Sequence, residues 1–346
     1  MKQTTNFLIF FFLLFFILLL SVYSVDIDSC QILNSGSYEL NTSIIHSGSN
    51  CFNISGNNVI LDCQGNNITL NSGGSYYGIY LTGDNVQISN CIISNFSQGI
   101  RLISNTNTTI QLNTVQHSVG NGIYLSGSTN NTFYLNRIEN NSGYGIGAFS
   151  TSSNNNITSN VLSGNNYAVG LTQSSNNNFL ISNTIKDNFL NGIFLSYSNN
   201  NLISLNTVTG NGIGFRILGD GEGNNLTLNN ITENINYNIN MNSGISGPYQ
   251  NLIYNNNLGN ISKIYSDDWS YWDISFNLST QGNTYYNNSA FGTGLTYCFG
   301  AGNCDYGATI TAFPLIITPS ITSSLFPIQG FLSVLTLISL LFLYFN

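Results

Sequence analysis

The side chains best suited to chemistry lie in one polar segment, Arg216-Ile-Leu-Gly-Asp220-Gly-Glu222-Gly, with Glu233 following shortly after. A glycoside hydrolase needs two carboxyl groups across a cleft, one of them a general acid. A polysaccharide lyase needs a base and commonly a carboxylate-bound Ca²⁺. Asp220, Glu222, Glu233 and Arg216 are therefore the catalytic candidates if the protein is an enzyme. The alternative is a polar turn, or a loop that could hold Ca²⁺, without catalysis.

A second group of side chains suits binding. Trp269, Tyr271 and Trp272 lie close together among aspartates, in a segment that has both tryptophans of the chain. Aromatic rings stack on the faces of sugars, and carboxylates accept hydrogen bonds from hydroxyl groups. The alternative is a structural cap. Tyr80 and Tyr124 each stand between apolar neighbours, so we expect these two rings to point outward as further binding residues.

Metal binding is not predicted. His46 and His117 are far apart, Met1 and Met241 are the two methionines, and the cysteines form no Cys-x-x-Cys. Copper sites need clusters of such ligands. We expect no cofactor, with Ca²⁺ at the acidic loop as the single exception.

The composition limits the partners of the protein. The 346 residues include 6 Lys+Arg and 14 Asp+Glu, for a formal net charge of −8, and only 6% of the residues are charged. Six basic residues are too few to neutralise the phosphate backbone of a nucleic acid. Nucleic-acid binding is therefore excluded. Asparagine is instead abundant, at 59 residues. The surface of the protein must be polar but uncharged.

The asparagines recur with a regular period. The pattern Asn-x-apolar repeats at intervals of about 23 residues. Its asparagines are Asn66, Asn90, Asn113, Asn136, Asn160, Asn183, Asn206, Asn229 and Asn256. Short runs with a period of two, such as GIYL at Gly78 and at Gly122, lie between them and predict strands. Polar turns such as SGSTNN separate the strands.

Strands this short are stable only when they stack. Each period then becomes one coil, and each strand pairs with its equivalent in the next coil about 4.8 Å away. The predicted fold is all-β, a parallel β-helix with coils of about 23 residues. The repeated asparagines should stack and hydrogen-bond one another. Repeated charges would repel, which explains their scarcity.

Units such as GIYLSGSTNNTFYLNRI (122–138) and GIFLSYSNNNLISLNTV (192–208) resemble the right-handed parallel β-helix repeats of NosD-like, carbohydrate-binding and sugar-hydrolase proteins. The flanking cysteines and NVILDCQGNNI (58–68) resemble secreted members of this group found widely in archaea. The resemblance implies either copper-related assembly or the binding or cleavage of polysaccharides. The Gly-His-Gly and Arg-x-Lys of the pectin hydrolases do not occur here.

Both ends of the chain are apolar. Residues 7–20 follow Lys2 and precede small residues, which is typical of a signal peptide over residues 1–24. Residues 331–345 are apolar, and we expect a membrane anchor within 314–346. Between these ends we expect an N-terminal cap and first coil over 25–65, β-helix repeats over 66–258 and a C-terminal cap over 259–313.

The six cysteines of an exported chain predict disulfides. Cys30 and Cys51 should join the N-terminal cap, and Cys298 and Cys304 should close a small loop. Cys63 and Cys91 lie in strand-like runs, as buried thiols or as a third disulfide.

Together these features predict an exported, membrane-anchored surface protein that binds polysaccharide or cell-envelope glycan and is not an enzyme. The alternatives are a polysaccharide lyase or glycoside hydrolase that uses the acidic segment, and a structural coat protein without a ligand.

Overall fold

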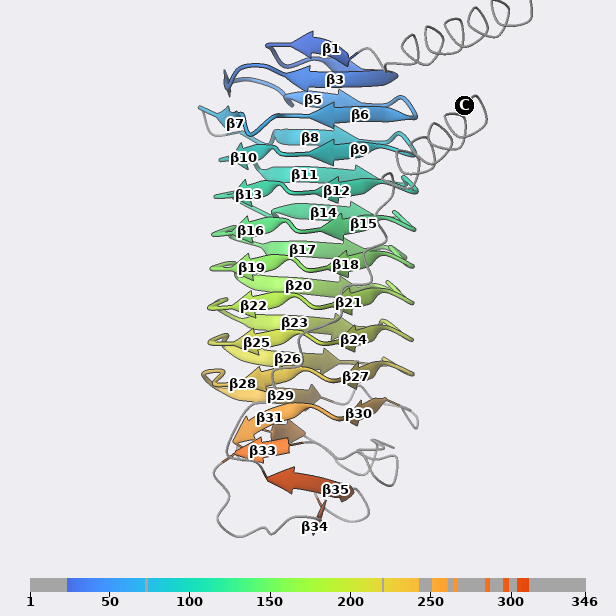
Figure 1. Ribbon diagram of the computed structural model, residues 1–346, viewed down its shortest axis with the longest axis vertical. Helices are drawn as coiled ribbons and strands as arrows, with labels where there is room; N and C mark the ends of the chain where they lie inside the picture. The colour runs from blue at the N-terminus through green and yellow to red at the C-terminus, as the bar shows by residue number, and fades with distance from the viewer. Residues whose placement is uncertain are drawn as a thin grey trace, which may run out of the picture. The chain divides into compact units, whose positions relative to one another are not determined.

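The computed structural model describes residues 24–71, 74–219, 221–242, 251–260, 264–266, 284–286, 295–298 and 304–310. In these ranges the chain forms strands and turns and no helix. Three sheets share the strands, so that each coil contributes one strand to each sheet (Figure 1). Of the described strand pairs, only β34–β35 is antiparallel. The predicted parallel β-helix is thereby confirmed.

Sheet A contains eleven strands. They are β1 (Ser24–Ile27), β3 (Gly36–Leu40), β6 (Val59–Asp62), β9 (Gln87–Ser89), β12 (Thr109–Gln111), β15 (Thr132–Tyr134), β18 (Asn156–Thr158), β21 (Phe179–Ile181), β24 (Leu202–Ser204), β27 (Asn225–Thr227) and β30 (Leu252–Tyr254).

Sheet B also contains eleven strands, several of which are longer. They are β2 (Ile32–Leu33), β5 (Phe52–Ile54), β8 (Tyr77–Leu81), β11 (Gln98–Ile103), β14 (Ile123–Ser126), β17 (Tyr144–Phe149), β20 (Tyr167–Thr172), β23 (Asn191–Ser196), β26 (Ile213–Leu218), β29 (Tyr237–Asn242) and β32 (Ile264–Ser266).

Sheet C contains thirteen strands. They are β4 (Ile44–His46), β7 (Asn67–Leu70), β10 (Ile92–Ser94), β13 (Thr114–Gln116), β16 (Arg137–Glu139), β19 (Val161–Ser163), β22 (Thr184–Lys186), β25 (Thr207–Thr209), β28 (Asn230–Thr232), β31 (Asn257–Asn260), β33 (Thr284–Tyr286), β34 (Leu295–Cys298) and β35 (Cys304–Ile310).

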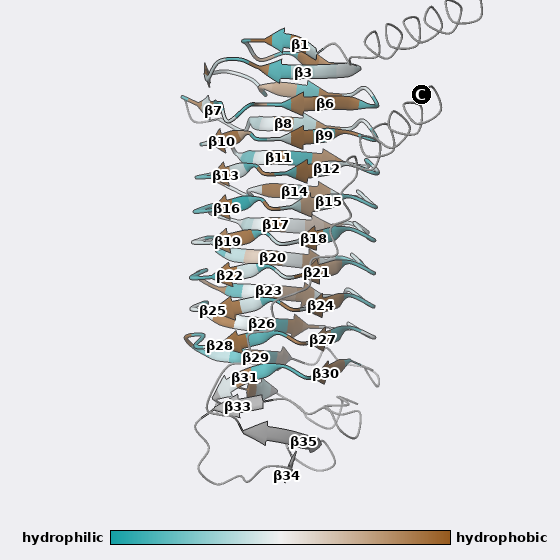
Figure 2. Cartoon of the chain, viewed as in Figure 1, coloured by the Kyte–Doolittle hydropathy of each residue, from teal (hydrophilic) through white to brown (hydrophobic). Residues whose placement is uncertain are grey.

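The core consists of aliphatic side chains stacked in register. Val115 pairs with Ile138 and Ile138 with Leu162, and none of the three is exposed. Alternate residues of a strand point to opposite faces, and the inward ones form the buried apolar core. Hydrophobic residues are concentrated in the strands and hydrophilic ones in the turns (Figure 2). The period of two therefore positions the core, as the sequence predicts.

Asparagine ladders fix the corners between the sheets. In the first ladder, each side-chain amide donates to the Oδ1 of the asparagine one coil further on, as Asn160 does to Asn183 at 3.1 Å. The Oδ1 of Asn183 also accepts the backbone N–H of Asn160 at 2.9 Å. The ladder contains Asn113, Asn136, Asn160, Asn183, Asn206, Asn229 and Asn256. This confirms the predicted stacking of asparagines.

The prediction for Asn90 is wrong. Ile92 pairs with Thr114, so Cys91, and not Asn90, occupies the position of Asn113 in the preceding coil. The backbone N–H of Cys91 donates to Asn113 Oδ1 at 2.9 Å. Asn90 is a left-handed turn residue with φ 55°, and its amide donates to Asp62 at 2.9 Å. Because the coils differ in length, the regular spacing of asparagines in the sequence does not reveal this one-residue shift.

Two further ladders were not predicted. The second runs at the corner between sheets B and A, and the third between sheets C and B. Their members are buried, and each side-chain amide donates to the next member: Asn131, Asn155, Asn178, Asn201 and Asn224 in the second, and Asn141, Asn165, Asn188, Asn211 and Asn234 in the third. At the end of the second ladder, Asn251 Oδ1 accepts the backbone N–H of Asn224. At the end of the third, the amide of Asn234 donates to Asn238, which lies on β29 of the same coil. Each corner of the coil therefore has its own column of buried amides.

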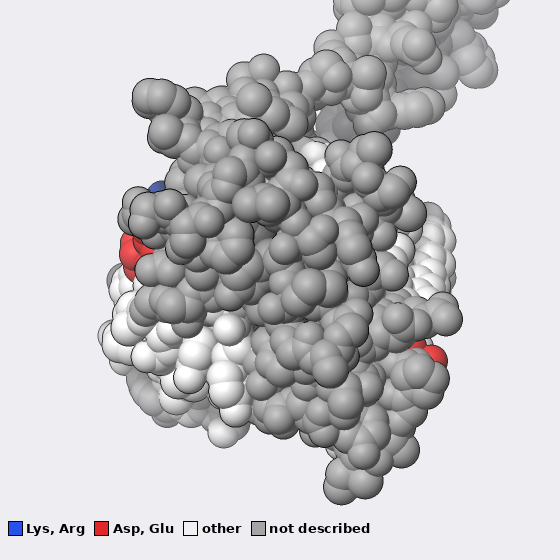
Figure 3. Space-filling model, turned by 90° about the horizontal axis from the view of Figure 1, so that it is seen from below, with Lys and Arg blue, Asp and Glu red and all other residues white. Residues whose placement is uncertain are grey.

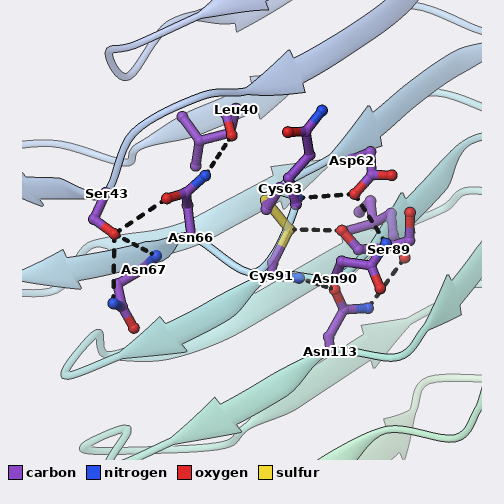
Figure 4. Close-up of a disulfide and its surroundings, with 12 residues drawn as sticks. Leu40, Ser43, Asp62, Cys63, Asn66, Asn67, Ser89, Asn90, Cys91 and Asn113 are labelled. Carbon is purple, nitrogen blue, oxygen red and sulfur yellow. Dashed lines mark hydrogen bonds between the residues drawn. A yellow bond between two sulfur atoms is a disulfide. The ribbon is translucent and has the colours of Figure 1, made fainter.

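Two disulfides join the first coils. Cys30–Cys51 is formed as predicted, and Cys63–Cys91 is a disulfide rather than a pair of thiols. Both cysteines of the second disulfide are fully buried (Figure 4). Because Cys91 occupies a ladder position, this disulfide replaces an amide contact at the N-terminal end of the first ladder. The side chains of Cys298 and Cys304, residues 1–23, over which a signal peptide is predicted, and residues 311–346 lie outside the described residues.

Within the described ranges, no helix is long and apolar enough to cross a membrane.

Candidate functional site

The catalytic candidates of the acidic segment are spread over several elements. Arg216 lies on β26 in sheet B. Glu222 is exposed in the turn after β26, where its backbone N–H donates to Asn199 Oδ1 at 2.8 Å. Glu233 is exposed at the corner between β28 and β29, in a left-handed conformation with φ 58°. Asp220 lies outside the described residues.

The described members of this group do not form an ion pair. The one ion pair found in the described part of the chain joins Arg137 and Glu139 at 2.7 Å. Glu222 follows the end of a sheet B strand, whereas Glu233 precedes the start of the next one. A catalytic role for these residues stays a prediction.

Of the predicted binding residues, two are described by the structure and three are not. Tyr80 and Tyr124 are partly exposed on the outer face of sheet B, on β8 and β14. Trp269, Tyr271 and Trp272 lie outside the described residues.

Tyr80 and Tyr124 belong to one outward-facing column of sheet B, which we call the central file. Arg101 pairs with Tyr80 on one side and with Tyr124 on the other. Strand register continues the file from Asn53 to Tyr265. Its members are Asn53, Tyr80, Arg101, Tyr124, Gly147, Gly170, Phe194, Arg216, Asn240 and Tyr265.

Two glycines in the file make room for neighbouring rings. A Cβ atom at Gly147 would lie 2.5 Å from Cε2 of Phe149, and one at Gly170 would lie 2.2 Å from Cε1 of Tyr144. Any other residue at these positions would displace the rings. The glycines therefore allow Phe149 and Tyr144 to lie across the sheet between Tyr124 and Phe194.

The rings form an almost continuous surface, which we call the aromatic face. Tyr124 stacks on Phe149 with centroids 5.1 Å apart, and Phe149 meets Tyr144 edge-on at 5.4 Å. Tyr144 stacks on Tyr167 at 4.6 Å, and Tyr167 lies 5.9 Å from Phe194. The face comprises Tyr77, Tyr80, Tyr124, Tyr144, Phe149, Tyr167 and Phe194. All seven are partly exposed.

Arg101 lies between the rings of Tyr77 and Tyr124 and joins the two parts of the aromatic face. Its guanidinium carbon lies 4.9 Å from the centroid of Tyr77 and 4.6 Å from that of Tyr124. Its Nη1 donates to Gln98 Oε1 at 3.2 Å. Cation–π contacts of this kind hold the planar group in one orientation.

Burial changes the acidity of one ring in the middle of the face. Desolvation, followed by the effect of neighbouring Tyr167, raises the pKa of Tyr144 to about 12. The folded state therefore favours the neutral phenol of Tyr144. The contribution of this preference to the free energy of unfolding is fully present below pH 10. It is lost as the pH rises toward 12.

Spectroscopic titration tests this shift. The difference between the tyrosinate absorbance of the protein and that of its Tyr144→Phe variant should have its midpoint near pH 12. A midpoint near pH 10 would show that Tyr144 is solvated like an ordinary tyrosine and that the packing described above is wrong.

The face is rich in aromatic side chains and poor in acidic ones. The described strands of sheet B contain no Asp or Glu, so they supply no pair of carboxyl groups for glycoside hydrolysis. The visible described surface at the C-terminal end also carries few charged side chains (Figure 3). What sheet B offers is flat apolar rings bordered by hydrogen-bonding groups.

The donor set does not suit copper. Among the described residues, no three His, Cys, Asp or Glu side chains gather in a potential metal site. Cys30, Cys51, Cys63 and Cys91 are in disulfides, and Met241 is fully buried. His46 Nε2 lies 2.8 Å from Ser49 Oγ, with which it shares a hydrogen bond. No step of the protein's chemistry is assigned to copper.

Five rings of the face were missed in the sequence. Tyr77, Tyr144, Phe149, Tyr167 and Phe194 occupy equivalent or adjacent positions in successive sheet B strands. The available signal was an aromatic residue in or beside most GIYL-like runs, with the GIRL run at Gly99 as an exception. Its use required the register of the coils, which only the pairing of strands fixes.

Comparison with known proteins agrees with this fold. The sequence model of the family named right-handed β-helix region matches residues 17–185. The sequence model of the family of the periplasmic copper-binding protein NosD matches residues 147–294. No curated protein matches the chain.

Several solved structures have a similar fold. The Azotobacter vinelandii mannuronan C-5 epimerase AlgE4 A-module has a TM-score of 0.59 at 14% identity, covering 76% of this chain and 83% of the module. The AlgE6 A-module from the same organism has a TM-score of 0.55 at 16% identity, covering 76% and 82%. The Dettilon tailspike protein has a TM-score of 0.50 at 17% identity, covering 73% and 61%.

The stacked parallel coils and the two family matches together identify this chain as a right-handed β-helix repeat protein of the NosD-like type.

Proposed function

We propose that the protein is exported and binds a polysaccharide on the aromatic face of sheet B without cleaving it. The observation that carries this proposal is the run of rings from Tyr80 to Phe194, spaced at 4.6–5.9 Å and interrupted only by Arg101. Aromatic surfaces that remain exposed in a monomer commonly mark binding sites.

The regular spacing favours a polymer over a small ligand. A pocket for a small molecule is concave and buries most of the ligand surface. The aromatic face instead lies on one flat sheet and extends over six strands, from β8 to β23. A repeating ligand can place one unit after another on such a surface.

The similar structures add support from their names. AlgE4 and AlgE6 are named as mannuronan epimerases, so their fold accommodates a polysaccharide. The family name NosD is that of a periplasmic protein, which favours export. The apolar residues 331–345 support our further proposal that the C-terminal segment 314–346 anchors the protein in a membrane.

The test is a panel of immobilised neutral and acidic polysaccharides, with and without Ca²⁺, exposed to the purified full chain in detergent. We expect retention on at least one polymer without release of reducing or unsaturated ends. Released products would overturn the non-catalytic proposal and direct attention to Asp220, Glu222 and Glu233. Failure of every polymer to retain the protein would overturn the binding proposal and favour a structural coat.

A further inference from the structure

The few basic residues of the protein are not distributed at random. The whole chain has 6 Lys+Arg against 14 Asp+Glu, yet Arg101 and Arg216 both lie in the central file. No Asp or Glu occurs in the described strands of sheet B. This face is thus locally cationic on an acidic protein, and local fields of this kind attract ligands of opposite charge.

Arg101 is held ready to bind an anion. One nitrogen donates to Gln98, and the rings of Tyr77 and Tyr124 fix the plane of the guanidinium group. The side chain is partly exposed. A guanidinium group has five N–H donors in a planar fork that matches a carboxylate or a sulfate. Its remaining donors are available at the surface of the aromatic face.

Arg216 lacks the partner that a buried donor normally has. Its Nε is buried and has no hydrogen-bond partner among the described residues, and no described carboxylate forms an ion pair with it. It pairs across the strands with Phe194 and with Asn240. The Oδ1 of Asn240 is likewise buried and has no hydrogen-bond partner in the described part of the chain. Such groups are rare in proteins and call for an explanation.

The basic residues of sheet C differ from these two arginines. Arg137 is neutralised by Glu139 at 2.7 Å, and Lys186 is exposed on β22. The described acids nearest in sequence to the sheet B strands lie at corners. Of these, Asp84 accepts hydrogen bonds from Thr106 at 2.7 and 3.1 Å, while Asp187, Glu222 and Glu233 are exposed turn residues.

We infer that the polysaccharide bound by the aromatic face is anionic, and that Arg101 and Arg216 bind its carboxylate or sulfate groups. This inference rests on the proposed function. The two arginines stand five strand steps apart in one file, a distance of about 24 Å. The rings from Tyr124 to Phe194 lie between them, so the polymer lies across the strands, along the direction in which the coils stack.

A matched pair of polymers tests the charge without any change to the protein. The full chain in detergent is titrated with a polyuronate and with its methyl ester, which has the same sugar backbone but no charge. A sulfated galactan and its desulfated form provide the second pair. We expect at least tenfold tighter binding of the charged member of one pair, and the pair that shows it identifies carboxylate or sulfate as the ligand.

Variants then assign the effect to the arginines. Arg101→Gln and Arg216→Gln should each weaken binding of the charged polymer about tenfold and leave binding of its neutral form unchanged. Arg137→Gln, on sheet C, is the matched control and should leave both unchanged.

Equal affinity for the charged and neutral members of both pairs would overturn the inference and leave the proposed function intact. The inference would also be overturned if Arg101→Gln and Arg216→Gln both bound the charged polymer with the full affinity of the unchanged protein. If none of the four polymers binds while another polymer of the panel retains the protein, the inference is overturned and the proposed function stands. If no polymer of the panel binds either, both are overturned. The comparison of polymers needs no variant, so it stands even if a substitution prevents folding.

Discussion

Replacing Asn178 with alanine should destabilise the protein by about 3–5 kcal/mol, because several buried groups would lose their partners at once. The side chain is fully buried in the second ladder. Its Nδ2 donates to Ser152 O and Asn201 Oδ1, each at 3.2 Å. Its Oδ1 accepts from Asn155 N at 2.9 Å and Asn155 Nδ2 at 3.1 Å. Urea unfolding followed by circular dichroism measures the change.

The neighbouring residue provides the control. Asn177 is exposed and has a φ of 56°, a conformation that glycine adopts without strain. Asn177→Gly should therefore change the free energy of unfolding by less than about 1 kcal/mol. Equal effects of the two substitutions would show that the buried ladder contributes nothing beyond an ordinary turn asparagine.

Replacing Tyr124 with alanine should weaken polysaccharide binding about thirtyfold, which corresponds to about 2 kcal/mol for a central aromatic residue of an interface. The ring contacts Phe149 at 5.1 Å and Arg101 at 4.6 Å, so its loss opens the middle of the aromatic face and releases the guanidinium group. The dissociation constant for the polymer retained most strongly measures the effect.

Tyr134 is the matched control for this experiment. It is 37% exposed on β15 of sheet A, away from the aromatic face. Tyr134→Ala should leave the affinity unchanged. If Tyr134→Ala weakens binding as much as Tyr124→Ala, the binding surface is not sheet B.

Much of the fold could be predicted because its determinants repeat. Inward residues such as Val115, Ile138 and Leu162 recur in each coil, so alternation and period together indicate stacked strands. The ladders at the other two corners were missed because Asn130-Asn131 and Asn177-Asn178 resemble simple turns. The first asparagine of each pair has a positive φ and is exposed, whereas the second is buried in the second ladder.

The site was harder to predict because it depends on neighbours that are distant in sequence. Tyr80 and Tyr124 were recognisable from their apolar flanks. Arg216 was grouped with Asp220 and Glu222 because these residues are close in sequence. The register instead aligns Arg216 with Phe194 and Asn240 from adjacent coils. An offset of one residue, such as that at Cys91, changes every such alignment.

The three amide ladders also make each coil an exchangeable module. A whole coil such as residues 160–182 begins and ends at equivalent ladder positions, because Asn160 and Asn183 have the same hydrogen bonds. Duplication or loss of such a unit would keep the strand pairing and the ladder hydrogen bonds in register at the new junction. The turns absorb small differences in length, because ladder asparagines that are bonded to each other lie 23, 24 or 27 residues apart. An insertion within a strand would instead shift the pairing of that strand with both neighbours. Length differences between related chains should therefore occur in turns or as complete coils, and each complete coil gained would extend sheet B by one strand spacing.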